Sequence, residues 1–207
     1  GYILTLLEGK VKDKKLIKKY LQKASNATDR LGYIIKDVDL ITEFETGVTN
    51  LKIEKFDLCK LIRELVDSFE IKMKEKGIEI TYEFGKNKSI FINADNFRIT
   101  QVMSNLIVNS LNYGVENGTI EIVTKNLSKE KLLVRVIDNG QGIPEDDLPR
   151  IFERFYRVDK TRNRQEGGSG LGLAIVKHIV EAHNEIVYVE SSLNVGSEFS
   201  FTLTKSN

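Results

Sequence analysis

The sequence is poor in cysteine, proline, histidine and long apolar runs. Its 207 residues include no tryptophan, two prolines, two histidines and one cysteine. A single cysteine excludes an internal disulfide framework and suits a reducing compartment. Cys59 lies in an amphipathic stretch and is interpreted as a small buried apolar side chain. No apolar run approaches the length of a membrane span and no secretory signal opens the chain, so we expect a segment of cytoplasmic character.

An excess of charge of either sign is also missing. Lysine and arginine total 31 against 30 aspartate and glutamate residues, which gives a net charge of +1. This balance predicts that neither nucleic acid nor an anionic membrane is the main partner. Hydrophobic residues make up 41% and charged residues 29% of the chain, which is typical of a globular protein with a substantial core.

The first 47 residues have a helical pattern. "GYILTLLEG" is interpreted as the end of a helix closed by Gly9, and Asp13 as the cap of a long helix that reaches Thr46 and stops at Gly47. Apolar or small residues recur in that helix at alternating spacings of four and three, at positions 17, 21, 24, 28, 31, 35 and 38. Two helices alone cannot bury so wide a stripe, so we expect a homodimer through this helical hairpin.

After residue 47 the pattern becomes mixed. We expect strands at 48–56, 78–84, 89–93, 119–126, 131–138, 185–191 and 198–204, and helices at 57–76, from Asp95 to about Gly114, and at 171–183. A loop rich in glycine and charged residues, from 139 to about 168, separates the strand expected at 131–138 from the helix expected at 171–183. The sequence therefore predicts two domains, residues 1–47 and 48–207, the second of the α+β class.

The stretch "DNGQGIP" begins with Asp138 directly after a predicted strand. A carboxylate at a strand end can accept a hydrogen bond from the amino group of a purine, and Gly140 and Gly142 let a flat ring approach the backbone. Asp-Asn-Gly is also a common turn sequence, so this motif alone leaves a simple turn as an alternative.

The stretch "GGSGLGLAIV", residues 167–176, is a glycine-rich entry into a helix. Such an entry presents free N–H groups and the positive end of the helix dipole to an anion. It is neither a Walker A loop nor a G-x-G-x-x-G motif. A merely flexible helix entry is the alternative.

The stretch "IFERFYRVD", residues 151–159, places aromatic residues and arginines in a charged loop. We expect Phe152 and Phe155 to pack against another surface, because aromatic side chains are unusual in an exposed charged loop. An arginine in a mobile lid can close on a phosphate. The alternative is a small hydrophobic anchor with solvated arginines.

The stretch "NLIVNSLNYG", residues 105–114, carries Asn105, Asn109 and Asn112 on one helical face. Asparagine is a poor helix former, whereas its amide oxygen is a suitable ligand for Mg²⁺, which keeps several waters and binds substrate phosphates. A polar stripe on a half-exposed helix is the alternative.

Together, these four segments resemble in order and spacing the histidine kinase catalytic domain of the GHKL ATPase superfamily. "NLIVNSLNYG" is similar to its N box, "DNGQGIP" to its G1 box, "IFERFYRVD" to its F box and "GGSGLGLAIV" to its G2 box. The resemblance implies a two-layer α/β sandwich, with a mixed sheet and helices on one face. It also implies that a truncated, all-α dimerisation and phosphotransfer hairpin precedes this sandwich.

The resemblance also implies roles for individual residues. Asn109 would be the Mg²⁺ ligand, Asn105 would support the phosphate or a metal-bound water, and Arg157 would contact the γ-phosphate of ATP during transfer. Asp138 would accept from the adenine amino group. The remaining implied positions are Asn112 and Tyr113 at the nucleotide, Gly140, Gly142 and Ile143 against the ring, Gly168, Gly170, Leu171 and Gly172 near the phosphates, and Phe152 and Phe155 as lid anchors.

The sequence departs from the family pattern at two points. Asn112 stands where the family commonly has lysine, and the phosphoacceptor histidine box is missing. His178 and His183, the only histidines, lack that motif and are interpreted as helix C-terminal cations or surface residues. We therefore expect that this chain alone does not autophosphorylate.

The expected function is that of the ATP-binding kinase core of a two-component sensor histidine kinase. The γ-phosphoryl group would pass, with Mg²⁺, to a histidine upstream and then to an aspartate of a response-regulator receiver domain. We expect the cytosolic part of a membrane-anchored sensor. The alternatives are a hydrolytic GHKL ATPase, which needs a glutamate where Asn105 stands, and a degenerate nucleotide-binding scaffold.

Overall fold

The computed structural model describes residues 2–9, 11, 13–45, 50–85, 89–158 and 169–206. The chain divides into two compact units, Gly1–Thr42 and Glu43–Asn207. Within the described ranges, no helix is both long and apolar enough to cross a membrane.

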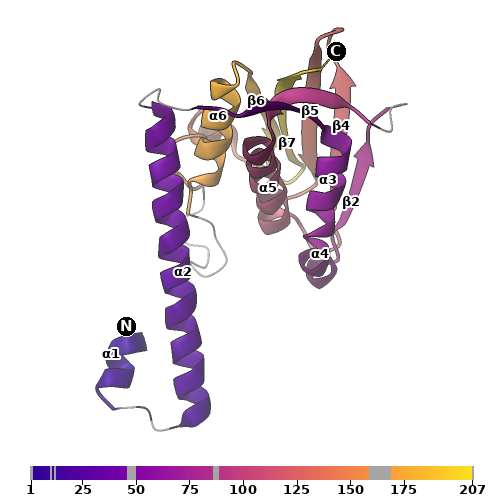
Figure 1. Ribbon diagram of the computed structural model, residues 1–207. Coiled ribbons are helices and arrows are strands. Elements are labelled where there is room, and N and C mark those ends of the chain that lie inside the picture. Colours follow the sequence, from indigo (N-terminus) through magenta and orange to yellow (C-terminus); the bar gives the residue numbers. More distant parts are fainter. Residues whose placement is uncertain are drawn as a thin grey trace. The chain divides into compact units, whose positions relative to one another are not determined.

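The first unit is helical, as the sequence predicted. It contains α1 (Tyr2–Leu7) and most of α2 (Lys14–Glu45), the long helix of Figure 1. Gly9 adopts a left-handed backbone (φ +66°) that closes α1, and Asp13 accepts a hydrogen bond from the N–H of Lys15 at 2.8 Å, as a helix cap does. Several apolar side chains of the α2 seam are exposed: Leu21, Leu31, Ile35 and Val38.

The second unit contains a five-stranded mixed sheet with the strand order β2-β4-β5-β7-β6. Its strands are β2 (Glu79–Glu83), β4 (Thr119–Asn126), β5 (Lys131–Asp138), β6 (Val187–Ser192) and β7 (Gly196–Thr204). Only the β2–β4 pair among these strands is parallel. A separate antiparallel pair joins β1 (Ile53–Asp57) to β3 (Phe91–Asp95), and an isolated bridge connects Ile92 to Lys205 just after β7.

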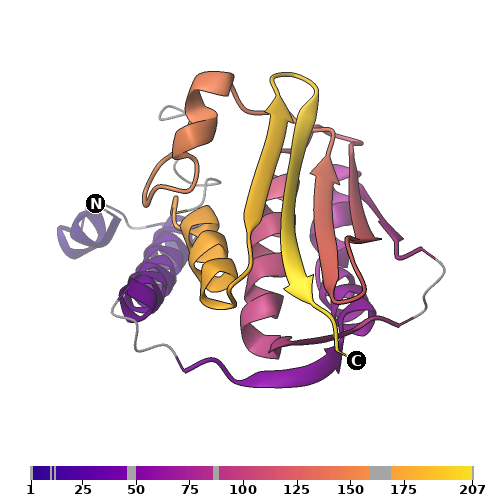
Figure 2. The same ribbon diagram turned by 90° about the horizontal axis from the view of Figure 1, so that it is seen from above.

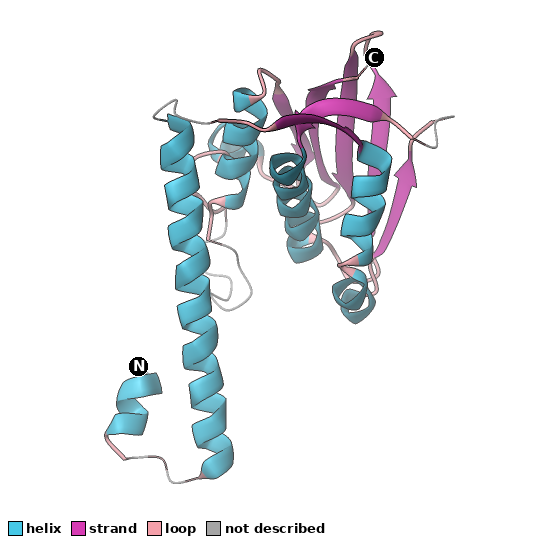
Figure 3. Cartoon of the chain, in the orientation of Figure 1, coloured by secondary structure: helices cyan, strands magenta, loops and turns pink. Residues whose placement is uncertain are grey.

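Three helices cover one face of this sheet: α3 (Leu58–Asp67), α5 (Asn96–Tyr113) and α6 (Gly172–Ala182), as Figures 2 and 3 show. Alternate strand residues point into this layer, including Val134, Val136 and Phe201, which are buried. Apolar residues of the helices complete the core. The prediction of a two-layer sandwich with helices on one face is confirmed.

One predicted helix is divided in the structure. The sequence predicted a continuous helix from Asp57 to Lys76, whereas α3 ends at Asp67 and α4 runs from Glu70 to Lys76. The Ser68 hydroxyl donates to the Leu65 carbonyl at 2.5 Å, and the N–H groups of Ser68 and Phe69 bond to carbonyls only three residues back. This tightened turn breaks the helical ladder.

The predicted loop after β5 contains a 3₁₀ helix, η1 (Glu145–Arg150), that the sequence reasoning missed. Pro144 precedes it, and three acidic residues occupy its first turn. Acidic residues in a first turn are a recognised helix start, so the composition did contain a signal.

His183 is half-buried, and both nitrogens of its ring form hydrogen bonds, which the sequence did not predict. Its Nε2 accepts a hydrogen bond from the N–H of Asp95 at 3.0 Å, which leaves Nδ1 as the protonated nitrogen that donates to the Ile179 carbonyl at 2.8 Å. The neutral ring therefore ties the end of α6 to the end of β3. For His178, burial and then the nearby charge of Arg154 lower the pKa, which also disfavours a cation.

Candidate functional site

Helix α5 carries the asparagine stripe of the sequence. Asp95 caps it by accepting from the N–H of Arg98 at 3.0 Å. Its buried stripe contains Ile99, Met103, Leu106 and Ser110. The three asparagines, Asn105, Asn109 and Asn112, are half-buried at the margin of that stripe, so each can present an amide to a ligand.

The Asn105 amide joins two of the predicted motifs. Its Nδ2 donates to the Gly172 carbonyl at 3.2 Å, which links the middle of α5 to the first turn of α6. A Cβ on Gly172 would lie 3.7 Å from the Asn105 side chain, an ordinary van der Waals contact. The segments similar to the N box and the G2 box therefore lie side by side.

Asp138 is a buried acceptor at the end of β5. It is 8% exposed, its Oδ2 accepts from the Ser110 hydroxyl at 3.0 Å, and its Oδ1 accepts from the N–H of Gly140 at 2.9 Å. Burial raises the pKa of Asp138, while the donors Gly140, Ser110 and the backbone of Ser197 oppose that rise. Sequence reasoning missed Ser110, although a hydroxyl within an apolar helical stripe was a usable signal.

The loop after Asp138 folds tightly against the end of α5. A Cβ at Gly140 would lie 2.6 Å from the Tyr113 carbonyl oxygen, and the N–H of Gln141 donates to that oxygen at 3.2 Å. At Gly142 (φ +68°) a Cβ would lie 2.0 Å from the Ser192 carbonyl oxygen. Both glycines are therefore required by contacts with the protein's own backbone, a role the sequence did not predict.

Two further predicted residues are Ile143, within this loop, and Tyr113, at the end of α5. The N–H of Ile143 donates to the Ser191 hydroxyl at 2.9 Å, which fixes the loop to β6. Tyr113, the last residue of α5, is 42% exposed, so its ring is available to a ligand.

The F-box segment meets the glycine-rich loop through its backbone. The N–H of Phe155 donates to the Gly170 carbonyl at 2.9 Å, and a Cβ at Gly170 (φ +78°) would lie 2.9 Å from the Phe155 Cα. The Phe155 side chain itself is 59% exposed, whereas Phe152 is half-buried and Leu171 fully buried. Gly168 lies outside the described residues.

Arg157 has an unusual environment for a guanidinium. Its Nε is buried and has no hydrogen-bond partner among the described residues. Buried polar atoms normally have partners, so this donor is one that a bound ligand could satisfy. In the same segment the Tyr156 hydroxyl donates to Asp147, and the Arg150 guanidinium lies 4.4 Å from the centre of the Tyr156 ring.

A metal held only by the protein is not indicated. In the part of the chain that the structure describes, no group of three or more histidine, cysteine, aspartate or glutamate side chains could hold an ion. Mg²⁺ at phosphate-transfer sites is generally held by few protein groups, several waters and substrate phosphates.

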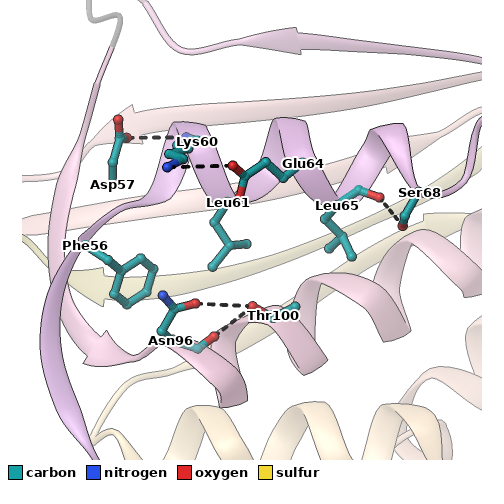
Figure 4. A pocket seen from close by; sticks show the side chains of 9 residues that line it. All are labelled: Phe56, Asp57, Lys60, Leu61, Glu64, Leu65, Ser68, Asn96 and Thr100. Carbon is teal, nitrogen blue, oxygen red and sulfur yellow. Dashed lines mark hydrogen bonds and ion pairs between the residues drawn. The ribbon is translucent and has the colours of Figure 1, made fainter.

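A groove with a volume of about 470 Å³ lies between α3 and the start of α5, away from the predicted site residues (Figure 4). Phe56, Leu61 and Leu65 provide its apolar lining. Among the polar groups around it, Thr100 donates to the Asn96 carbonyl at 2.8 Å, Ser68 donates to the Leu65 carbonyl, and Asp57 accepts from the N–H of Ile90 at 3.2 Å. It contains no residue of the four motifs.

Comparison with known proteins identifies the family. Residues 94–207 match the family model described as "Histidine kinase-, DNA gyrase B-, and HSP90-like ATPase". The chain therefore belongs to this ATPase family. Within it, the chain is homologous to the WalK sensor histidine kinases, with 33% identity to that of Bacillus subtilis (strain 168) over 98% of the chain. The chain spans one third of the length of that relative.

Solved structures of histidine kinases have the same fold. Full-length ShkA in complex with AMPPNP matches with a TM-score of 0.81 at 26% identity, covering 99% of this chain and 42% of that one. ThkA in complex with the response regulator TrrA matches with a TM-score of 0.76 at 28% identity, covering 99% of this chain and 56% of that one. The sequence-based prediction of a histidine kinase catalytic fold is confirmed.

Proposed function

We propose that this chain is the ATP-binding kinase core of a two-component sensor histidine kinase. Its γ-phosphoryl acceptor would be a histidine outside this sequence, and an aspartate of a response-regulator receiver domain would receive the group next. The observation that carries the proposal is the buried Asp138 carboxylate, held by Ser110 and Gly140 beside the asparagine face of α5. The complexes named for ShkA and ThkA, with AMPPNP and with a response regulator, support the same reading.

Adenine recognition would rest on Asp138. Each carboxylate oxygen has two lone pairs, so the carboxylate has four acceptor positions. Gly140, Ser110 and the Ser197 backbone occupy three of them, which leaves one for an exocyclic amine. Gly140, Gly142 and Ile143 would border the ring, and the exposed Tyr113 would line the pocket. Because burial strengthens hydrogen bonds and penalises unpaired groups, a purine without the amine would bind less tightly.

Phosphate and metal binding would fall to α5 and the start of α6. When bound, ATP with Mg²⁺ supplies the transferable phosphoryl group. Asn109 would ligate Mg²⁺ through its amide oxygen, a donor that fits this hard cation, and Asn105 and Asn112 would support the phosphates. Backbone N–H groups of the glycine-rich loop would donate to phosphate oxygens. These groups belong to Gly168, Gly170, Leu171 and Gly172.

Arg157 would neutralise charge during transfer. Its buried Nε, which has no hydrogen-bond partner among the described residues, supports this role, because a phosphate oxygen would accept from such a donor. Phe152 and Phe155 would anchor the lid that carries it, with the Phe155 backbone bound to Gly170.

Transfer to a protein is favoured over hydrolysis. A hydrolytic relative needs a carboxylate base one helical turn before the metal-binding asparagine, and Asn105 occupies that position with an amide that donates to Gly172. An amide cannot remove a proton from water.

The helical unit would form the dimer. We propose that residues 1–47 are part of a dimerisation and phosphotransfer hairpin, that residues 48–207 are the catalytic domain, and that the whole is the cytosolic part of a membrane-anchored sensor. The exposed apolar seam of α2 supports homodimerisation, because a second copy would bury it.

The first prediction tests the adenine assignment. Asp138→Asn should weaken binding of ADP with Mg²⁺ about tenfold or more, because the amide places a donor where an acceptor is needed. Titration calorimetry on the 207-residue chain measures this. Asp67→Asn, at the exposed end of α3, is the matched control and should bind normally. Unchanged affinity in Asp138→Asn would remove the assignment.

A further inference from the structure

The Ser110 hydroxyl forms a hydrogen bond with Asp138, a residue far away in the sequence. A serine within a helix ordinarily bonds back to the carbonyl four residues earlier. Ser110 is 1% exposed, and its Oγ instead donates to Asp138 Oδ2 at 3.0 Å, across 28 residues and from helix to strand. A simple need to satisfy a buried hydroxyl would not require this choice.

Hydrogen bonds restrict rotation of the Asp138 carboxylate. Oδ1 accepts from the Gly140 N–H at 2.9 Å and Oδ2 from the Ser110 hydroxyl, and the Ser197 backbone is a further donor, so these bonds together orient the carboxylate. The neighbouring Asn139 does not compete, because its Oδ1 accepts from the Thr119 N–H at 2.8 Å. Among the donors from described residues, Ser110 is the one that uses its side chain, so it is the one that a substitution can remove.

We propose that Ser110 is a positioning residue for adenine recognition: its hydroxyl fixes the Asp138 carboxylate so that the remaining acceptor position faces the exocyclic amine of the base. This inference rests on the proposed function. Without the Ser110 bond, the Oδ2 side of the carboxylate has no side-chain donor among the described residues, and the group can rotate away from the base.

The electrostatics of the site give the proposal a specific readout. Burial raises the pKa of Asp138, and three neutral donors, Gly140, Ser110 and the Ser197 backbone, lower it. No charged side chain is among these influences. Removal of the Ser110 donor should therefore move the pKa of Asp138 further upward, and protonation should interfere with adenine binding at a higher pH than in the unaltered chain.

The test compares Ser110→Ala, Ser110→Thr and, as control, Ser104→Ala on the same helix. Affinity for ADP and for inosine diphosphate, which lacks the amine, is measured by calorimetry from about pH 5 to about pH 8. Ser110→Ala should bind ADP about fivefold less tightly, the equivalent of one ordinary hydrogen bond, and inosine diphosphate with little change. Its acid midpoint for ADP binding should move upward, and Ser110→Thr, which keeps the hydroxyl, should restore both properties.

Two results would overturn the role of Ser110 alone. One is ADP affinity and pH dependence of Ser110→Ala that match the unaltered chain while Asp138→Asn fails to bind. The other is an equal loss for ADP and inosine diphosphate, which indicates general loosening of α5. Normal ADP binding by Asp138→Asn would instead overturn the adenine assignment and this inference with it.

Discussion

Glu185 lies at the centre of a buried polar network at the base of the sheet. Its Oε1 accepts from Lys131 Nζ at 2.6 Å and from the Thr204 hydroxyl at 2.7 Å, and its Oε2 accepts from the Thr202 hydroxyl at 2.6 Å. Burial alone would raise the pKa of Glu185, but the hydrogen bonds from Lys131, Thr202 and Thr204 outweigh it and lower the pKa. The ionised carboxylate therefore stabilises the fold that carries the site.

Glu185→Gln should lower the free energy of unfolding at pH 7 by about 1–3 kcal/mol, because it leaves Lys131 without its charged acceptor. A carboxylate with a lowered folded pKa contributes stability above its ordinary pKa of 4.5, and this stability is lost as pH falls through the folded value. The difference between the two chains should thus shrink in acid. Urea unfolding at several pH values measures it.

Glu130→Gln, at an exposed loop position, is the control and should change stability little at any pH. A Glu185→Gln deficit that stays constant from neutral to acid pH would contradict the ionic role of the network.

Candidate site residues could be selected from the sequence where the pattern was local. Asp138 and the asparagine stripe could be recognised because each motif is continuous in the chain. Ser110 and His183 could not be assigned, because their partners lie 28 and 88 residues away and only folding brings them together. The packing role of Gly142 against Ser192 was hidden for the same reason.

At the scale of elements, capping residues predicted helix starts well and interior breaks poorly. Asp13, Asp57 and Asp95 each cap the helix that the sequence assigned to them. The break between α3 and α4 was missed because a serine hydroxyl that bonds back to its own helix leaves no periodicity change in the sequence. The start of α6 has no such capping residue, and the loop before it is held by the contact between Gly170 and the Phe155 backbone.

Gly170→Ala should destabilise the chain by about 2 kcal/mol or more. The variant combines a left-handed backbone with a Cβ placed against the Phe155 backbone, which cannot move aside as a flexible side chain would. Gly85→Ala is a matched control, because Gly85 has a similar φ of +61° and nothing within 4 Å of an added Cβ.

Thermal unfolding of both variants separates the two contributions. The control should lose about 1 kcal/mol from backbone strain alone, and the excess in Gly170→Ala reports the contact between the glycine-rich loop and Phe155. Equal losses would show that this contact contributes nothing.

At the scale of the whole molecule, the exposed seam of α2 is the largest feature left unexplained by the catalytic unit. Leu31 and Ile35 are each 60% exposed, although their spacing is that of a packed helical bundle. A helix that exposes such an apolar face to water is unfavourable, and association of two copies would bury it.

We predict that the chain sediments as a dimer in the micromolar range and that Ile35→Glu weakens the dimer about tenfold or more, because a charge would be buried in the seam. Lys36→Glu, an exposed position beside it, should leave the dimer largely intact. Sedimentation across a concentration series provides the measurement. A chain that stays monomeric at high concentration would refute the dimer.

Asp95 forms hydrogen bonds with three segments that are far from one another in the sequence. Its Oδ1 caps α5 at Arg98, its Oδ2 accepts from the N–H of Lys52 at 2.9 Å, and its own N–H is bound by His183 at the end of α6. Local opening at any one of these segments disturbs the residue that the other two share. The first turn of the asparagine helix, the backbone before β1 and the end of the G2 helix therefore cannot fray independently, and they form one cooperative unit beneath the site.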